Sequence, residues 1–180
     1  MSKSTQSSAK PAKTVAKDTA PAFDVGKALL HSYITNEKVN QFMLTGLATE
    51  AWRAEPPNGG RPIAAIFAHI HNVRVMWLKV AAKDSKLPAQ LDRNTVTMAQ
   101  AKKALKQSAA ALAVLLKKSL ASGGKISNFK PDVAGFFGYL IAHDAHHRGQ
   151  VAMLARQLGH PIPQSTMFGM WEWNSRGQGK

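Results

Sequence analysis

The chain has 180 residues, of which 44% are hydrophobic, and this is enough for one domain with a sizeable core. It contains no cysteine, so disulfides and thiolate metal sites are excluded, and any metal must be held by histidine or carboxylate side chains. The formal net charge of +14 raises the question of a nucleic-acid or acidic-membrane partner.

The first 22 residues are rich in Ser, Lys and Ala and lack the apolar core of a secretory signal. We expect residues 1–22 to form a disordered basic tail and residues 23–180 to form a single domain. The tail has a net charge of +3 and the rest of the chain +11, so the excess is spread out and not concentrated in a basic run with interleaved aromatic residues. We therefore expect no dedicated nucleic-acid binding.

No apolar stretch approaches the roughly 20 residues that cross a bilayer. Together with the missing signal, this predicts a cytoplasmic protein with no membrane partner.

Four long segments with helical periodicity follow the tail, separated by turn-forming residues. They cover about residues 24–52, 62–82, 97–122 and 132–158. Three of them begin at residues suited to cap a helix: Asp24, Thr97 and Asp132. Residues 162–180 show no such period and are expected to be an irregular, partly aromatic segment. The pattern predicts an all-α fold, an antiparallel four-helix bundle.

Three histidines fall on the apolar faces of two of these segments. At ~100° per residue, His69 lies inside the apolar sector of segment 62–82. His143 and His147 replace the middle turn of the apolar stripe of segment 132–158, at the i, i+4 spacing that lets two imidazoles grip one ion. Burying imidazoles is costly unless their nitrogens find partners, and one ion supplies a partner to all three. We predict a metal site formed by His69, His143 and His147.

The alternative is that these histidines are core side chains, bonded to backbone or to each other. Three protein ligands leave coordination positions open, which is typical of catalytic sites and not of closed structural ones. All-imidazole ligation suits zinc, nickel, iron or copper about equally, so the ion is a divalent metal of unspecified identity. The His-Glu-x-x-His motif of zinc proteases and a phosphate-binding glycine loop are both missing.

Two further histidines lie close to the predicted site in the sequence. His71 projects away from the apolar sector, with Arg74 among its polar neighbours, and is expected at the surface. His146 lies about 60° to one side of the stripe. We expect it to face solvent, with a place at a pocket mouth as the alternative.

Other polar side chains could support the site. Asp144 and Gln150 could fix the tautomer of a ligating ring, and Arg148 could hold an anionic substrate, although each could equally make an ordinary surface contact. Glu37 shares a helix face with apolar residues and so looks into the bundle. It is either a general base or the partner of a basic neighbour, and the second is the simpler interpretation.

The motif His-x-x-His-His-Arg-Gly-Gln, from His143 to Gln150, resembles the signature of the DinB/YfiT-like family of helical metal-dependent proteins. Residues 59–63 leading into Ala-His-Ile at 68–70 resemble the start of its second helix. Leu-Gly-His-Pro at 158–161, followed by Trp-Glu-Trp at 171–173, resembles its C-terminal segment. The likeness extends over about residues 24–173.

This resemblance implies an up-down-down-up bundle, a divalent ion (Zn, Ni or Fe) on His69, His143 and His147, and a homodimer. Related branches act with low-molecular-weight thiols, which implies a metal-dependent transferase or hydrolase with a small electrophilic substrate. Two alternatives stay open: a non-catalytic stress-related binding protein with a structural metal, and a basic nucleic-acid-associated helical protein. The family name derives from DNA-damage induction and implies no repair chemistry.

Overall fold

The structure is a computed structural model that describes residues 22–82 and 86–177. These residues form helices and no extended strand, so the all-α prediction is confirmed. None of their helices is long and apolar enough to cross a bilayer. The helices are α1 Val25–Thr45, α2 Ile63–Ala81, α3 Met98–Ala121, α4 Val133–Gln157, α5 Gln164–Gly169 and α6 Trp173–Gly177.

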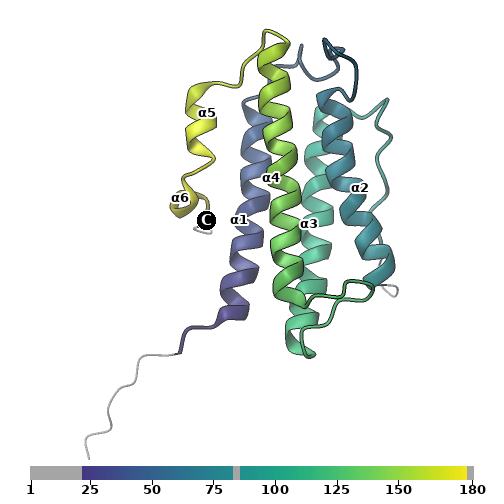
Figure 1. The fold of residues 1–180 in the computed structure, drawn as a ribbon, viewed down its shortest axis with the longest axis vertical. Helices are drawn as coiled ribbons and strands as arrows, with labels where there is room; N and C mark the ends of the chain where they lie inside the picture. Colours follow the sequence, from purple (N-terminus) through teal and green to yellow (C-terminus); the bar gives the residue numbers. More distant parts are fainter. Residues whose placement is uncertain (1–21, 83–85, 178–180) are drawn as a thin grey trace, which may run out of the picture.

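The four long helices lie side by side, as Figure 1 shows. Both α1 and α2 pack against α3 and against α4. The loops that follow α1 and α4 lie at one end of the molecule, and the loop between α3 and α4 lies at the other (Figure 1). Side chains of α1, α2 and α4 therefore share one interior.

The three predicted N-caps are present. The Asp24 carboxylate accepts the backbone N–H of Lys27 at 3.0 Å, and Asp132 accepts that of Gly135 at 2.9 Å. Thr97 forms a full capping box with Gln100, in which each side chain accepts the other residue's backbone N–H. These bonds satisfy backbone donors that the first helical turn leaves without partners.

The first helix is shorter than predicted, because it ends at Thr45 and not near Trp52. A Cβ at Gly46 would lie 2.5 Å from the Thr166 hydroxyl, so the α5 segment packs directly against this turn. Residues 46–62 then cross the end of the bundle and bury Trp52, whose indole donates to the Val96 carbonyl at 3.0 Å. Tertiary packing therefore ends the helix before the turn-forming prolines and glycines of residues 56–60 are reached.

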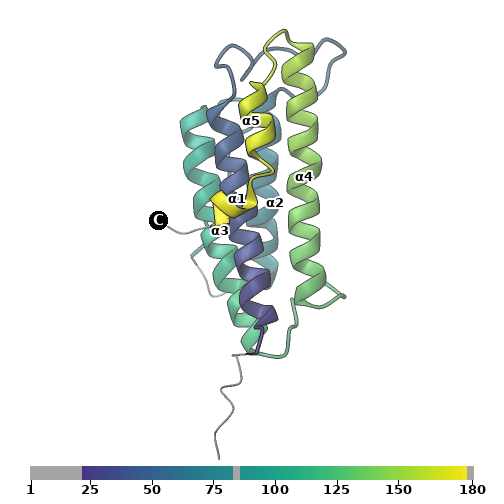
Figure 2. The same ribbon diagram turned by 90° about the vertical axis from the view of Figure 1, so that its left-hand side faces the viewer.

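The prediction of an irregular C-terminal segment is wrong for part of its length. Residues 164–169 and 173–177 form α5 and α6, which pack back onto α1 (Figure 2). The Arg176 guanidinium lies 3.3 Å from the centroid of the Phe42 ring, a cation–π contact that ties α6 to α1. The predicted basic tail, except for Ala22, lies outside the described residues.

The core has two apolar clusters with a polar layer between them. One cluster includes Met43, Phe67 and Val151, and the other includes Tyr33 and Phe137. The intervening turns of the helices carry buried polar side chains: Asn36, Glu37 and Asn40 of α1, His71 and Arg74 of α2, Ser108 of α3, and Asp144 and His147 of α4. Of the predicted metal ligands, His147 belongs to this layer, whereas His69 and His143 are half-buried.

Candidate metal centre

His69 of α2 meets His143 and His147 of α4 at this layer. The ring centroid of His69 lies 5.4 Å from that of His143 and 4.8 Å from that of His147. The centroids of the His143 and His147 rings are 4.5 Å apart. One nitrogen from each ring lies within 4.8 Å of the other two. The structure therefore brings together all three residues singled out in the sequence.

The donor set fits a divalent ion. Nitrogens bound to one tetrahedral ion at 2.0–2.1 Å are about 3.3 Å from each other, and the Nε2 atoms of His143 and His147 are 3.2 Å apart. One nitrogen of His69 lies within 4.8 Å of a nitrogen from each of the other two rings. A hydrogen bond between His143 and His147 has the same Nε2–Nε2 distance. Such a bond, however, gives no role to His69.

Burial keeps two of the rings neutral near pH 7. Burial lowers the pKa of His69 to about 4, and the nearby charges of His147, Arg61 and His143 contribute in the same direction. Burial also lowers the pKa of His147, although its bond to Gln150 opposes the shift. A neutral imidazole offers a lone pair, which is the form that binds metals.

Gln150 orients His147, as the sequence suggested. Its Oε1 atom lies 2.7 Å from His147 Nδ1, and its Nε2 atom lies 3.0 Å from His146 Nε2. Because the amide oxygen can only accept, Nδ1 of His147 carries the proton. The lone pair of His147 is then on Nε2, the nitrogen that faces His143.

Asp144 has a different main role from the one considered in the sequence. Its Oδ1 atom lies 3.8 Å from His143 Nδ1, beyond hydrogen-bond range. Its Oδ2 atom instead accepts from Arg74 at 2.6 Å, Asn36 at 2.7 Å and Asn40 at 2.9 Å. Burial raises the pKa of Asp144, but the charge of Arg74 and the side-chain hydrogen bonds to this carboxylate together outweigh burial and hold the pKa well below its usual range.

Arg74, named in the sequence analysis as a polar neighbour of His71, is among the largest fully buried side chains. Its charge is tolerated because the guanidinium also pairs with Glu37 at 2.7 Å. The simpler interpretation of Glu37, an ion pair, is thus confirmed. Arg148 is similarly occupied, donating to the side-chain oxygens of Asn36 and Asn40 at 2.9 and 2.6 Å, so it does not serve a substrate in this arrangement.

The surface position expected for His71 is wrong, because the side chain is fully buried. Its Nδ1 atom lies 3.1 Å from Ser108 Oγ, and its Nε2 atom lies 2.8 Å from the Ala89 carbonyl. Helix α2 packs against α3 as well as α4, so two of its sides are covered. His71 lies on the α3 side and is separate from the three-histidine cluster.

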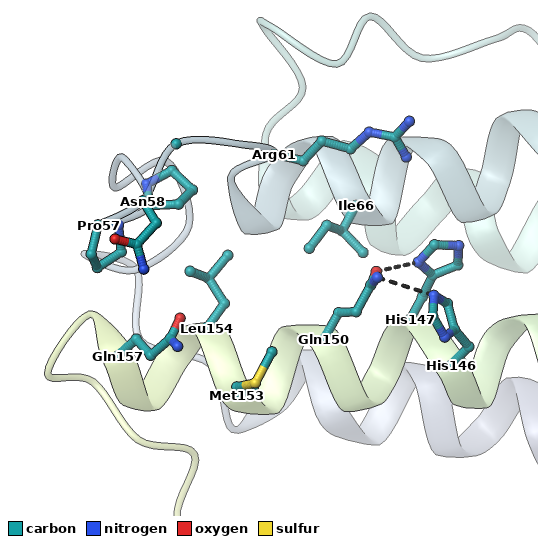
Figure 3. Close-up of a pocket in the computed structure, with 12 residues that line it drawn as sticks. Pro57, Asn58, Arg61, Ile66, His146, His147, Gln150, Met153, Leu154 and Gln157 are labelled. Carbon is teal, nitrogen blue, oxygen red and sulfur yellow. Dashed lines mark hydrogen bonds between the residues drawn. The ribbon is translucent and has the colours of Figure 1, made fainter.

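A cavity of about 480 Å³ opens beside His147 (Figure 3). Its walls come from residues 56–59 and Arg61, from Ile66 of α2 and from the C-terminal half of α4. His146 is exposed, as expected, and also lines this cavity, so both interpretations considered for it hold. One of the three candidate ligands, His147, is therefore reachable from solvent through a pocket.

Comparison with sequence models of protein families matches the DinB family over residues 21–178. The chain belongs to the DinB family. A search of curated proteins finds no match. The match covers slightly more of the chain than the likeness seen in the motifs, and it extends over the whole of the described helical region.

Proposed function

We propose that this chain binds one divalent cation through His69, His143 and His147 and carries out chemistry on a small molecule at the open coordination positions. The observation that supports the proposal is the convergence of one nitrogen from each ring to within 4.8 Å. We further propose that its four long helices form the up-down-down-up antiparallel bundle implied by the family resemblance. In that order α2 and α4 run in opposite directions.

An ion held by three imidazoles supplies Lewis acidity, which lowers the pKa of a bound water or thiol and polarises carbonyl groups. The chain's own residues prepare the site for it. Gln150 fixes the tautomer of His147, and burial keeps His69 and His147 unprotonated near pH 7. The Arg74–Asp144 pair fixes α2 against α4, so the two ligand-bearing helices keep their spacing.

The reaction class that we propose is a thiol-dependent transfer, with hydrolysis as the alternative. The cavity beside His147 has a volume of about 480 Å³, within the roughly 300–1,000 Å³ of small-molecule sites. This space suits a low-molecular-weight thiol or a small electrophile. A cytoplasmic homodimer is part of the same proposal and rests on the family resemblance.

The test is elemental analysis of protein purified without a metal-affinity step, followed by titration of metal-free protein with Zn²⁺, Ni²⁺ and Fe²⁺. We expect one ion per chain in the wild type and none in the His143→Ala/His147→Ala double variant. His31→Ala, at an exposed histidine of α1, is the matched control and should bind as the wild type does. A wild-type protein that takes up no stoichiometric ion contradicts the proposal.

The same variants separate a catalytic from a structural metal. If the double variant stays folded by circular dichroism but loses thiol transfer to electrophilic acceptors, the metal serves chemistry. If it unfolds, the metal serves the fold, as in the non-catalytic alternative.

A further inference from the structure

The cavity beside His147 carries a single charge of fixed sign. Among the described residues that line it, Arg61 is the one charged side chain, and no carboxylate is present. The other lining groups carry no fixed charge: amides, two histidines and apolar side chains. A cavity with this lining favours a ligand with a negative group.

The loop before α2 gives Arg61 its position. Gly59 and Gly60 have φ values of 72° and 103°, in the left-handed region that other residues rarely adopt. The Gly59 N–H also donates to the Pro56 carbonyl at 3.0 Å, which closes a turn. Figure 3 shows Arg61 on the α2 side of the cavity, across from Gln150 of α4.

The guanidinium of Arg61 is available for a ligand. No hydrogen bond or ion pair joins it to another residue in the described ranges, whereas Arg74 and Arg148 are bound to carboxylate and amide oxygens. An unpaired guanidinium beside an apolar wall can form two parallel hydrogen bonds to a carboxylate.

We propose that Arg61 binds the carboxylate of a small substrate whose reactive end faces His69, His143 and His147. A single guanidinium with no lysine beside it matches one negative charge better than the charge of about −1.5 to −2 on a phosphate monoester. Ile66, Met153 and Leu154 line the same cavity and provide contact for a short hydrocarbon body. The inference rests on the proposed function, because it names the substrate class of that same site.

The test compares two thiols that differ in their charged end, 3-mercaptopropionate and 2-mercaptoethanol, by isothermal titration calorimetry on the zinc-loaded protein. Arg61→Gln should lower the affinity for 3-mercaptopropionate by about three- to tenfold, as expected for a partly exposed charge pair. The affinity for 2-mercaptoethanol should stay unchanged. The control is Arg156→Gln, at an exposed arginine of α4 outside the cavity lining. This variant should bind both thiols with the wild-type affinity. An equal effect of Arg61→Gln on both thiols, or no effect, overturns the inference.

A second measurement separates this inference from the proposed function. In metal-free protein, NMR titration with propionate should shift the Arg61 Nε–H resonance and saturate at lower concentration than with inorganic phosphate. If the protein binds no metal but propionate still shifts Arg61, the inference stands and the proposed function fails. If metal binds and propionate leaves Arg61 unshifted, or phosphate binds more tightly, the inference fails and the proposed function stands.

Discussion

Arg74 of α2 and Asp144 of α4 form a fully buried ion pair with an N–O distance of 2.6 Å. The same two helices carry the three candidate metal ligands, and Asp144 follows His143 directly in the sequence. The pair therefore sets the spacing of α2 and α4 at the depth where His69 has to meet His143 and His147. It connects the stability of the core to the geometry of the site.

Replacing Arg74 by Leu should destabilise the metal-free protein by about 3–5 kcal/mol, because Asp144 and Glu37 are left buried without their counter-charge. Urea unfolding followed by circular dichroism measures this. Lys79→Leu, which removes an exposed charge from the same helix, should change the unfolding free energy by less than about 0.5 kcal/mol. Similar values for the two variants would show that the buried pair does not hold the helices together.

Replacing Gln150 by Leu should weaken metal binding about tenfold, because His147 loses the hydrogen bond that fixes its tautomer and ring orientation. Competition with a chromophoric chelator measures the affinity. Gln157→Leu is the control, since Gln157 also lines the cavity and forms no hydrogen bond to a described histidine. We expect it to bind metal as the wild type does; equal losses in both variants would rule out an orienting role for Gln150.

The stability of the metal-free protein should fall as the pH is lowered from about 6.5 through about 4. Burial first, and then the neighbouring histidines and Arg61, lower the pKa of His69 to about 4, so between these values the unfolded chain binds more protons than the folded one. The loss at His69 alone is on the order of 1 kcal/mol, because its side chain is partly exposed and solvent screens the effect.

Urea unfolding at pH 7.5 and pH 4.5 measures this dependence, and His69→Gln should reduce it. An unchanged difference between the two pH values in the variant would contradict the assignment to His69. Bound metal should be released over the same acidic range, because protons compete for the ligand nitrogens.

Replacing Gly46 by Ala should destabilise the protein by about 1–3 kcal/mol, because the new Cβ would overlap the Thr166 side chain. Thr166→Ala in the same chain should recover part of the loss. The control is Gly138→Ala, in the interior of α4, where a Cβ meets nothing within 4 Å. That variant should be neutral or more stable, since alanine favours helix; a Gly46→Ala protein as stable as this control would contradict the close packing of α5 on α1.

Local patterns predicted what depends on one helix at a time. The caps at Asp24, Thr97 and Asp132 depend on residues within one turn, and the i, i+4 spacing of His143 and His147 is fixed by helix geometry alone. The inclusion of His69 followed from its place in an apolar sector. These features need no knowledge of which helices are neighbours.

What the sequence did not predict depends on partners far away in the chain. His71 was predicted at the surface because one apolar stripe was assumed, whereas α2 packs against both α3 and α4 and buries two sides. The charge of Arg74 is compensated by Glu37 and Asp144, which lie on other helices. The early end of α1 and the folding of α6 depend in the same way on the distant residues Thr166 and Phe42.

X-ray absorption spectroscopy on the zinc-loaded protein tests the central claim most directly, because it counts the ligand atoms and identifies imidazole. We expect three imidazole nitrogens at about 2.0–2.1 Å and one or more oxygen ligands from solvent. In His69→Ala the count should fall to two. A shell made mainly of oxygen, or a spectrum that His69→Ala leaves unchanged, would contradict a metal centre built from these three histidines.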